Sequence, residues 1–399
     1  MKGRWLTLLA TMSACASTDA VLGGYDASSE EPVRTRDAGL TPDAAPVERD
    51  AGECDDCEYF PEVCTADTLC QSGLFDPALP GGALDPRTLL LAIRGRSATD
   101  VWVAGALGAV AHFDGTSWRR SDLGSPGTVR GLWLLDSAEI AVGLANQVFA
   151  EQLVYARGTG APDGGSPPDG DGWKRFTVQL PSYYPIEIIS AWAAPAAGAS
   201  LWVATESVFD VTGSGVLRLR PSPSGGFELR SGPLSPCEPG CKSMKSLHGS
   251  SPDALWAVGA NGTALRITNA ESEAPSVKIY NTRTWNSLNG VWAASDSDAW
   301  AVGANGTIRH FTGHPRDWDI VEDVPTGVEL NAIWGASASD VWAVGDAGVV
   351  VHYDGTSWSR VKVAGLGARR PQLTTVWVAA SGHVWIGGEG ILLSLGGKP

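Results

Sequence analysis

Three of the six histidines in this chain recur at one spacing, and histidine is well suited to acid–base or metal chemistry near neutral pH. His112, His310 and His352 each lie ten residues after a tryptophan. A metal site or a catalytic base needs its partners side by side. Because a repeated position places the three rings on separate structural units, we predict that they are structural.

Familiar catalytic motifs are absent from the sequence. It has no Gly-x-Ser-x-Gly, no His-Glu-x-x-His and no Gly-Lys-Ser/Thr phosphate loop. Four carboxylates precede apolar strands at equivalent places and would be the first to test for action on glycans: Asp100, Asp253, Asp298 and Asp340. Their regular recurrence favours turn capping, so we predict no catalytic residue and no cofactor.

The seven cysteines divide into one near the N-terminus and six others. Six is an even number, as three disulfides in an oxidising compartment would require. Four of them form a cluster that allows three pairings, and two form a local pair, whereas the spacing lacks the paired Cys-x-x-Cys pattern of zinc ribbons. We predict disulfides rather than a metal site, from Cys54, Cys57, Cys64, Cys70, Cys237 and Cys241.

An Asp- and Gly-rich run at residues 163–172 offers carboxylate oxygens of the kind that calcium prefers. It lacks the third acidic ligand and the closing glutamate of an EF-hand loop. Its Gly and Pro content favours a flexible surface loop, and calcium binding stays open.

A repeat of about 40 residues must position all of these groups. Each copy has short apolar strands, glycine turns and fixed tryptophans, and the copies are spaced by 38 to 62 residues. Their anchor residues are Trp102, Ile140, Trp202, Trp256, Trp300, Trp342 and Trp385.

A second position, seven to ten residues before each anchor, ends the first strand of each unit. Both faces of a blade are covered by its neighbours, so we predict that these side chains pack between blades. The alternative is a ligand surface at one mouth of a ring, formed by Arg94, His248, Trp292, Trp334 and Trp377. The full set, called the ladder residues below, is Arg94, Trp133, Trp192, His248, Trp292, Trp334 and Trp377.

Seven copies without any long amphipathic helical pattern predict an all-β, seven-bladed β-propeller. The last copy stops after its third strand, at Ile391–Leu395. Phe75 precedes Arg94 by 19 residues, the interval that separates Trp358 from Trp377. We therefore predict that residues 73–79 supply the missing strand and close the ring.

The phrases Trp-Ala-Val-Gly at 342–345 and Asp-Gly-Thr-Ser-Trp at 354–358 resemble the tryptophan-rich blades of the photosystem II stability/assembly factor family. They also resemble the wider sialidase-like Asp-box (BNR-like) repeats, although Trp358 follows Asp354 one position sooner than in that motif. The resemblance covers residues 74–395 and implies the fold. No counterpart of the sialidase arginine triad, Tyr/Glu pair or acid Asp is recognisable, so it implies no catalytic residue.

The N-terminal region has the order of a secretory signal. Two basic residues, a short apolar stretch and Met12-Ser-Ala-Cys15 resemble a bacterial lipoprotein signal at residues 1–15, with Cys15 acylated. Residues 16–52 have the composition of a disordered acidic linker. Residues 53–72 would be a disulfide-stapled segment before the propeller at 73–399.

Charge and composition limit the partners. Residues 16–72 carry -11 of the net charge of -15, and no basic stripe is present for nucleic acid. We predict an exported monomer, tethered by its lipid to the outer membrane or cell surface. It would bind a protein or polysaccharide of the cell envelope; the alternative is an exported enzyme that acts on glycans.

Overall fold

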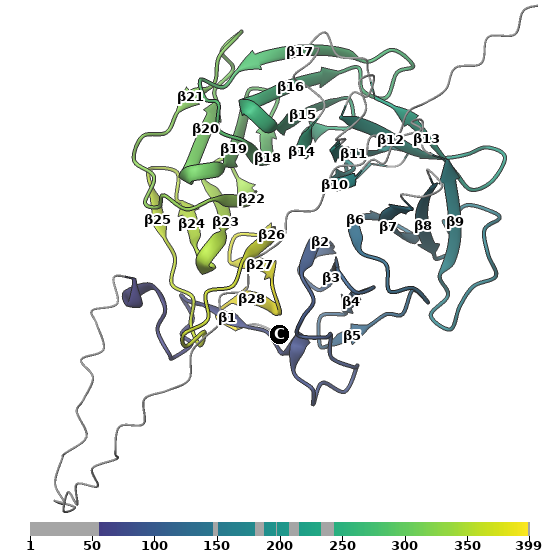
Figure 1. Cartoon of the computed structure of the whole chain (residues 1–399), viewed down its shortest axis with the longest axis horizontal. Coiled ribbons are helices and arrows are strands. Elements are labelled where there is room, and N and C mark those ends of the chain that lie inside the picture. The colour runs from purple at the N-terminus through teal and green to yellow at the C-terminus, as the bar shows by residue number, and fades with distance from the viewer. Residues whose placement is uncertain are drawn as a thin grey trace, which may run out of the picture. The chain divides into compact units, whose positions relative to one another are not determined.

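The chain forms a ring of four-stranded sheets (Figure 1). The computed structural model describes residues 56–146, 151–179, 187–196, 198–206, 215–232 and 243–397. Within these ranges, seven antiparallel sheets of four strands each surround a common centre, which confirms the all-β, seven-bladed propeller. Among the same residues, no helix has the length and apolar character needed to cross a membrane.

Blades 1 to 3 use consecutive strands, numbered from the innermost outward. Blade 1 contains β2 (Leu90–Ser97), β3 (Asp100–Gly105), β4 (Val110–Phe113) and β5 (Trp118–Arg120). Blade 2 contains β6 (Val129–Leu135), β7 (Ala138–Asn146), β8 (Glu151–Arg157) and β9 (Lys174–Gln179). Blade 3 contains β10 (Glu187–Trp192), β11 (Leu201–Glu206), β12 (Val216–Pro221) and β13 (Phe227–Ser231).

Blades 4 to 6 follow the same order. Blade 4 contains β14 (Met244–Ser251), β15 (Ala254–Gly259), β16 (Thr263–Thr268) and β17 (Ser276–Asn281). Blade 5 contains β18 (Leu288–Ser295), β19 (Asp298–Gly303), β20 (Thr307–Phe311) and β21 (Asp319–Ile320). Blade 6 contains β22 (Leu330–Ser337), β23 (Asp340–Gly345), β24 (Val350–Tyr353) and β25 (Trp358–Arg360).

Blade 7 joins the two ends of the propeller. Its inner strands are β26 (Leu373–Ala380), β27 (His383–Gly388) and β28 (Ile391–Leu395), and its outer strand is β1 (Leu69–Gln71). Leu69 pairs with Leu395, and the same residue bridges to Val363 at the end of blade 6. An N-terminal strand therefore closes the ring, as predicted.

The residues of this closing strand differ from the prediction. Phe75 lies in the 3₁₀ helix η2 (Gly73–Phe75) instead of a strand. Pro77 has no backbone N–H to donate, and the Asp76 carboxylate accepts the Ala78 N–H at 2.9 Å, so residues 73–79 turn away from the sheet. The prediction of a strand at 73–79 is wrong by a few residues.

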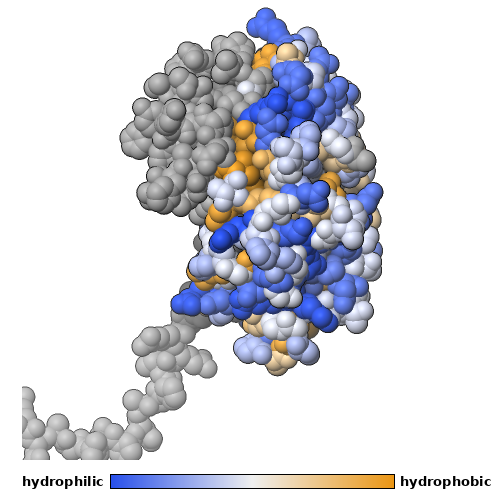
Figure 2. Space-filling view, turned by 90° about the vertical axis from the view of Figure 1, so that its right-hand side faces the viewer, coloured by the Kyte–Doolittle hydropathy of each residue, from blue (hydrophilic) through white to orange (hydrophobic). Residues whose placement is uncertain are grey.

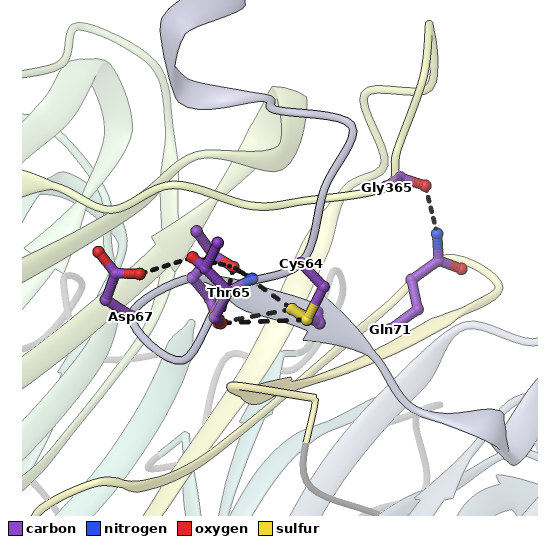
Figure 3. The surroundings of a disulfide bond; sticks show 7 residues. Cys64, Thr65, Asp67, Gln71 and Gly365 are labelled. Atoms are coloured by element: carbon purple, nitrogen blue, oxygen red, sulfur yellow. Dashed lines mark hydrogen bonds between the residues drawn. A yellow bond between two sulfur atoms is a disulfide. The ribbon is translucent and has the colours of Figure 1, made fainter.

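The disulfide Cys64–Cys70 holds the chain just before and within β1 (Figure 3). Gln71, at the end of the strand, donates from Nε2 to the carbonyl of Gly365 at 2.8 Å. Cys57, in η1 (Cys57–Tyr59), is also disulfide-bonded. Cys54, Cys237 and Cys241 lie outside the described residues, as does Cys15.

The hydrophobic core is divided among the interfaces between neighbouring blades. In one such interface Trp256 of blade 4 packs edge-on against Trp318 of blade 5, with ring centroids 4.8 Å apart. Trp300 of blade 5 meets Trp358 of blade 6 in the same way, at 5.4 Å. Such aromatic pairs add to the burial energy, so each blade is stabilised mainly by the next one.

Short turns connect the second and third strands on one face of the ring. Asn261 and Gly262, in η3 (Ala260–Gly262), both have positive φ, 54° and 67°. Asn305 and Gly306, in η4 (Ala304–Gly306), repeat the geometry, as does η5 (Asp346–Gly348). Asn and Gly suit these positions because they tolerate a left-handed backbone. Figure 2 shows a described surface that is mostly hydrophilic or of intermediate hydropathy, with smaller hydrophobic areas.

Candidate functional site

The innermost strands of all seven described blades converge on one cavity of about 310 Å³, called the central cavity here. Its wall contains one half-buried side chain from each strand, three residues before the ladder residue. These strands otherwise bury apolar residues, because blades cover both of their faces. The seven residues, called the rim residues below, are Leu91, Arg130, Ile189, Lys245, Asn289, Asn331 and Thr374.

Polar rim residues bind one blade to the next. Lys245 Nζ donates to Asn289 Oδ1 at 3.0 Å, and Arg130 pairs with Glu187 at 2.5 Å. Three rim side chains also donate to a backbone carbonyl at the start of the following inner strand. These pairs are Asn289 with Leu330, Asn331 with Leu373, and Thr374 with Leu90.

Trp334 lies at the inner end of the central cavity. Its indole borders the cores of four interfaces and contacts ladder residues of two other blades. The Arg94 guanidinium of blade 1 lies 4.6 Å from the ring centroid, and the His248 ring of blade 4 meets it edge-on at 4.8 Å. The structure thus brings Arg94, His248 and Trp334 together from separate blades.

Arg94 is a cation without a carboxylate partner among the described residues. It donates to two backbone carbonyls, of Ile93 at 2.7 Å and Ala191 at 3.2 Å. Protein surrounds it except toward the central cavity, and this burial lowers its pKa to about 10. A guanidinium has five N–H donors, so donors remain for an anion that enters the cavity.

His248 is neutral at this site. Burial, reinforced by the charge of Arg94, lowers its pKa to about 3. Its Nδ1 accepts the backbone N–H of Ala293 at 3.1 Å, which requires that this nitrogen carry no proton. His248 therefore joins blade 4 to blade 5 and adds no positive charge beside Arg94.

The other ladder tryptophans pack between blades. A Cβ added to Gly335 would lie 2.7 Å from Cη2 of Trp292, so the absence of a side chain there admits the indole. Gly249 receives Trp192 and Gly95 receives Trp377 in the same way. Blade 7 has Val378 at the equivalent position, and the indole of Trp334 is accordingly found at the cavity instead.

The repeated histidines belong to the blades rather than to the central cavity. Each lies flat on the anchor tryptophan of its own blade and bonds through Nε2 to an aspartate that precedes that tryptophan. The ring centroids are 3.7 to 4.3 Å apart and the N–O distances are 2.8 to 2.9 Å. These triplets are Trp102, His112 and Asp100; Trp300, His310 and Asp298; and Trp342, His352 and Asp340.

The remaining candidate residues do not converge. Asp253 accepts the backbone N–H of Glu271 at 3.1 Å, as a turn cap would. Asp169 accepts the N–H groups of Asp171 and Trp173 within its own loop. Among the described residues, no three His, Cys, Asp or Glu side chains lie together as a metal site would require.

Sequence reasoning singled out Arg94 and His248 but missed the rim residues. Their signal is a polar side chain at one fixed place in strands that are otherwise apolar. Arg130, Lys245, Asn289 and Asn331 all show it. Aligning the units on the ladder residues, and comparing the place three residues earlier, would have found them.

Solved propellers resemble this chain in fold. A structure of YCF48 bound to a D1 peptide has a TM-score of 0.55 at 15% identity and covers 84% of this chain and 96% of that one. YCF48 from Cyanidioschyzon merolae has the same TM-score and identity, covering 78% and 96%. The structure of U3-55K has a TM-score of 0.54 at 8% identity, covering 82% and 93%. No protein-family model and no curated protein matches the sequence significantly.

These likenesses confirm, at the level of fold, the resemblance to the photosystem II assembly factor family, to which YCF48 belongs. The identities are too low to carry over an activity or a site.

Proposed function

We propose that this chain is a binding module that holds a segment of a partner protein in its central cavity and performs no catalysis. The observation that carries this proposal is Arg94, a cation in a cavity shared by all seven described blades, which makes no ion pair among the described residues. The two carboxylates of the lining, Glu206 and Glu329, accept hydrogen bonds from Ser243 and Asn289 instead. A ligand that brings an anion would supply the missing partner.

The cavity favours an acidic side chain on an otherwise polar segment. Arg94 offers charged donors at the inner end, and the face of Trp334 provides an apolar wall beside them. Nearer the entrance, rim residues such as Lys245 and Asn289 can exchange their present hydrogen bonds for bonds to a ligand backbone. A protein segment with one Asp or Glu fits this distribution better than a wholly apolar ligand.

Support from known structures is limited to the shared fold. YCF48 has been solved with a D1 peptide bound, so a ring of this kind holds a peptide in at least that protein. The Doa1 propeller, with a TM-score of 0.50 at 11% identity, has the WD40 form of the fold. A peptide-binding role for this chain is consistent with both.

The proposal places the protein at the cell envelope. The lipoprotein-like segment ending at Cys15 would tether it to a membrane after export, and residues 16–52 would separate the ring from that surface. The cysteine number and the Cys64–Cys70 disulfide agree with an oxidising compartment. The partner would then be an envelope protein.

The rival function, an enzyme that acts on glycans, has less support. Asp100, Asp298 and Asp340 are each engaged by a histidine of their own blade, so they are fixed in separate places around the ring. A glycosidase needs two carboxyl groups about 5 to 10 Å apart across one bond. The two carboxylates that line the central cavity, Glu206 and Glu329, each accept a hydrogen bond from a neighbouring side chain, and the cations Arg94, Arg130 and Lys245 line the same cavity.

Binding of the full chain to an array of short peptides tests the proposal, if each Asp or Glu peptide is paired with its Asn or Gln counterpart. We expect a subset of acidic peptides to bind and their amide counterparts to bind at least about tenfold more weakly. Arg94→Met should abolish that preference. Arg119→Met, an exposed position on the outer strand of blade 1, is the matched control and should behave as wild type.

Equal binding of acidic and amide peptides, or an unchanged preference in Arg94→Met, would show that the central cavity does not work in this way. A glycan panel is measured in parallel. Turnover of any glycan by the wild-type chain would replace the binding function with the enzymatic one.

A further inference from the structure

A second pocket lies between blades 7 and 1, called the side pocket below. It has a volume of about 230 Å³ and is lined by Phe113, His383, Trp385, Ser394 and the turn residues Ala98 and Thr99. These turns follow the innermost strands, whereas the rim residues lie near the beginning of the same strands. The side pocket therefore opens on the face of the ring opposite the entrance of the central cavity.

The side pocket exists where one repeated contact is missing. Five of the six anchor tryptophans have a planar group from the third strand of their own blade against the indole. In blades 1, 5 and 6 this group is the histidine described above. In blades 3 and 4 it is an arginine, with Arg218 at 5.5 Å from Trp202 and Arg266 at 5.1 Å from Trp256.

Trp385 is the exception among the anchor tryptophans. Ser394 pairs with it across the strands, in the position that His112 occupies opposite Trp102. A serine is too short to cover an indole. Blade 7 also lacks the aspartate that bonds the histidine in blade 1. His383 occupies the position that Asp100 has there.

Blade 1 approaches Trp385 but does not replace the missing ring. Phe113 lies 5.5 Å from the indole in a tilted arrangement, and Trp118 meets it edge-on at 5.4 Å. Equivalent contacts from the next blade are present at Trp300, where Tyr353 and Trp358 take part, in addition to its histidine. The space left at Trp385 is thus the place of the blade's own planar group.

We propose that the side pocket binds one neutral aromatic side chain, Phe or Tyr, of a partner protein. The repeat itself provides the template, since imidazole rings fill the equivalent places at centroid distances of 3.7 to 4.3 Å. Cavities of about 150 Å³ lined by apolar side chains bind benzene, so this volume suffices for a phenyl ring.

The charge of the lining selects a neutral ring over a cation. Among the described residues that line the side pocket, none is Asp, Glu, Lys or Arg. A guanidinium or ammonium group would lose its hydration there without gaining a carboxylate, which is unfavourable. The exposed His383 lies at the mouth of the side pocket and can form a hydrogen bond with the hydroxyl of a tyrosine.

Ligand-observed NMR titration of the full chain with N-acetyl-tyrosinamide tests this site. We expect saturable binding of one molecule, with N-acetyl-leucinamide at least about tenfold weaker. The double substitution Ser394→His with His383→Asp restores the pair found in blade 1. It should weaken binding of the tyrosine amide at least about tenfold while the melting temperature stays the same or rises.

Two further variants keep the test decisive. His383→Trp, at the exposed mouth of the side pocket, blocks the entrance without altering the core and should also abolish binding. It serves as the test if the double variant does not fold. His310→Ser with Asp298→His reproduces beside Trp300 the pair found at Trp385 and should raise the number of bound molecules from one to two.

The proposal is overturned if the wild-type chain shows no saturable binding of the tyrosine amide, or if the leucine amide binds equally well. It is also overturned if the folded double variant or His383→Trp binds as tightly as wild type. None of these results depends on Arg94, so this site and the central cavity can fail independently.

Discussion

Gly335→Ala tests whether the ladder tryptophans hold adjacent blades together. A Cβ at this position would lie 2.7 Å, 2.8 Å and 2.9 Å from three ring atoms of Trp292, where ordinary van der Waals contact begins at 3.4 Å. The indole would have to withdraw by about 0.7 Å, and it is only 5% exposed. Since the ring is rigid and packed on both sides, the clash cannot be relieved by a simple rotation.

The expected cost is that of overpacking a well-packed core, about 1–3 kcal/mol in the free energy of unfolding. Urea unfolding followed by far-UV circular dichroism measures it without relying on tryptophan fluorescence. Gly170→Ala is the matched control, because an added Cβ there meets no atom within 4 Å and the residue is exposed. That variant should be as stable as wild type.

A double-mutant cycle identifies the cause. In a Trp292→Leu background the ring is gone, so Gly335→Ala should cost less than about 0.5 kcal/mol. Equal costs of Gly335→Ala in both backgrounds would refute the reasoning, as would a neutral Gly335→Ala. Either result would mean that the contact between Trp292 and blade 6 does not help to hold the two blades together.

Two other predictions concern closure and pH. Removing residues 1–72 deletes β1 and exposes the edge of β28, so this variant should aggregate or melt earlier in gel filtration and thermal unfolding, whereas removing residues 1–53 should leave the compact unit Cys54–Pro399 intact. The pKa of His248 is lowered to about 3 in the folded chain and is near 6.5 when unfolded, so the unfolded state binds more protons below pH 6.5. This group therefore removes stability as the pH falls from 6.5 toward 3, and His248→Gln should lose less stability than wild type between pH 7 and 4.5 in urea unfolding; an equal loss would argue against a neutral buried His248.

Most of the fold is predictable from the sequence because each blade uses the same positions for the same contacts. The anchors lie in the second strands and the ladder residues in the first strands, as their spacing indicates, although only Trp192 ends its strand as predicted. The closing strand was misplaced because Phe75 matched that spacing. In the structure Leu69 pairs there instead, since backbone hydrogen bonds, unlike the aromatic contacts of other blades, do not require a particular side chain.

The candidate site was harder to predict. Arg94 and His248 were recognisable because each replaces a tryptophan in the ladder. The position of Trp334 depends on a residue of the neighbouring blade, Val378, where blades 1, 4 and 6 have glycine. Such a relation between adjacent copies is invisible when each copy is compared only with the repeat pattern. The side pocket is of the same kind, because a serine in place of a histidine attracts no notice until the indole opposite it is known.

Closure by β1 also sets the order in which the ring can be completed as the chain folds. Blades 1 to 6 consist of strands adjacent in the chain, so each can form from local pairings. Blade 7 cannot, because Leu69 must meet Leu395 from the other end of the propeller. Until these two ends meet, β28 has an unpaired edge that a chaperone or a second chain could occupy.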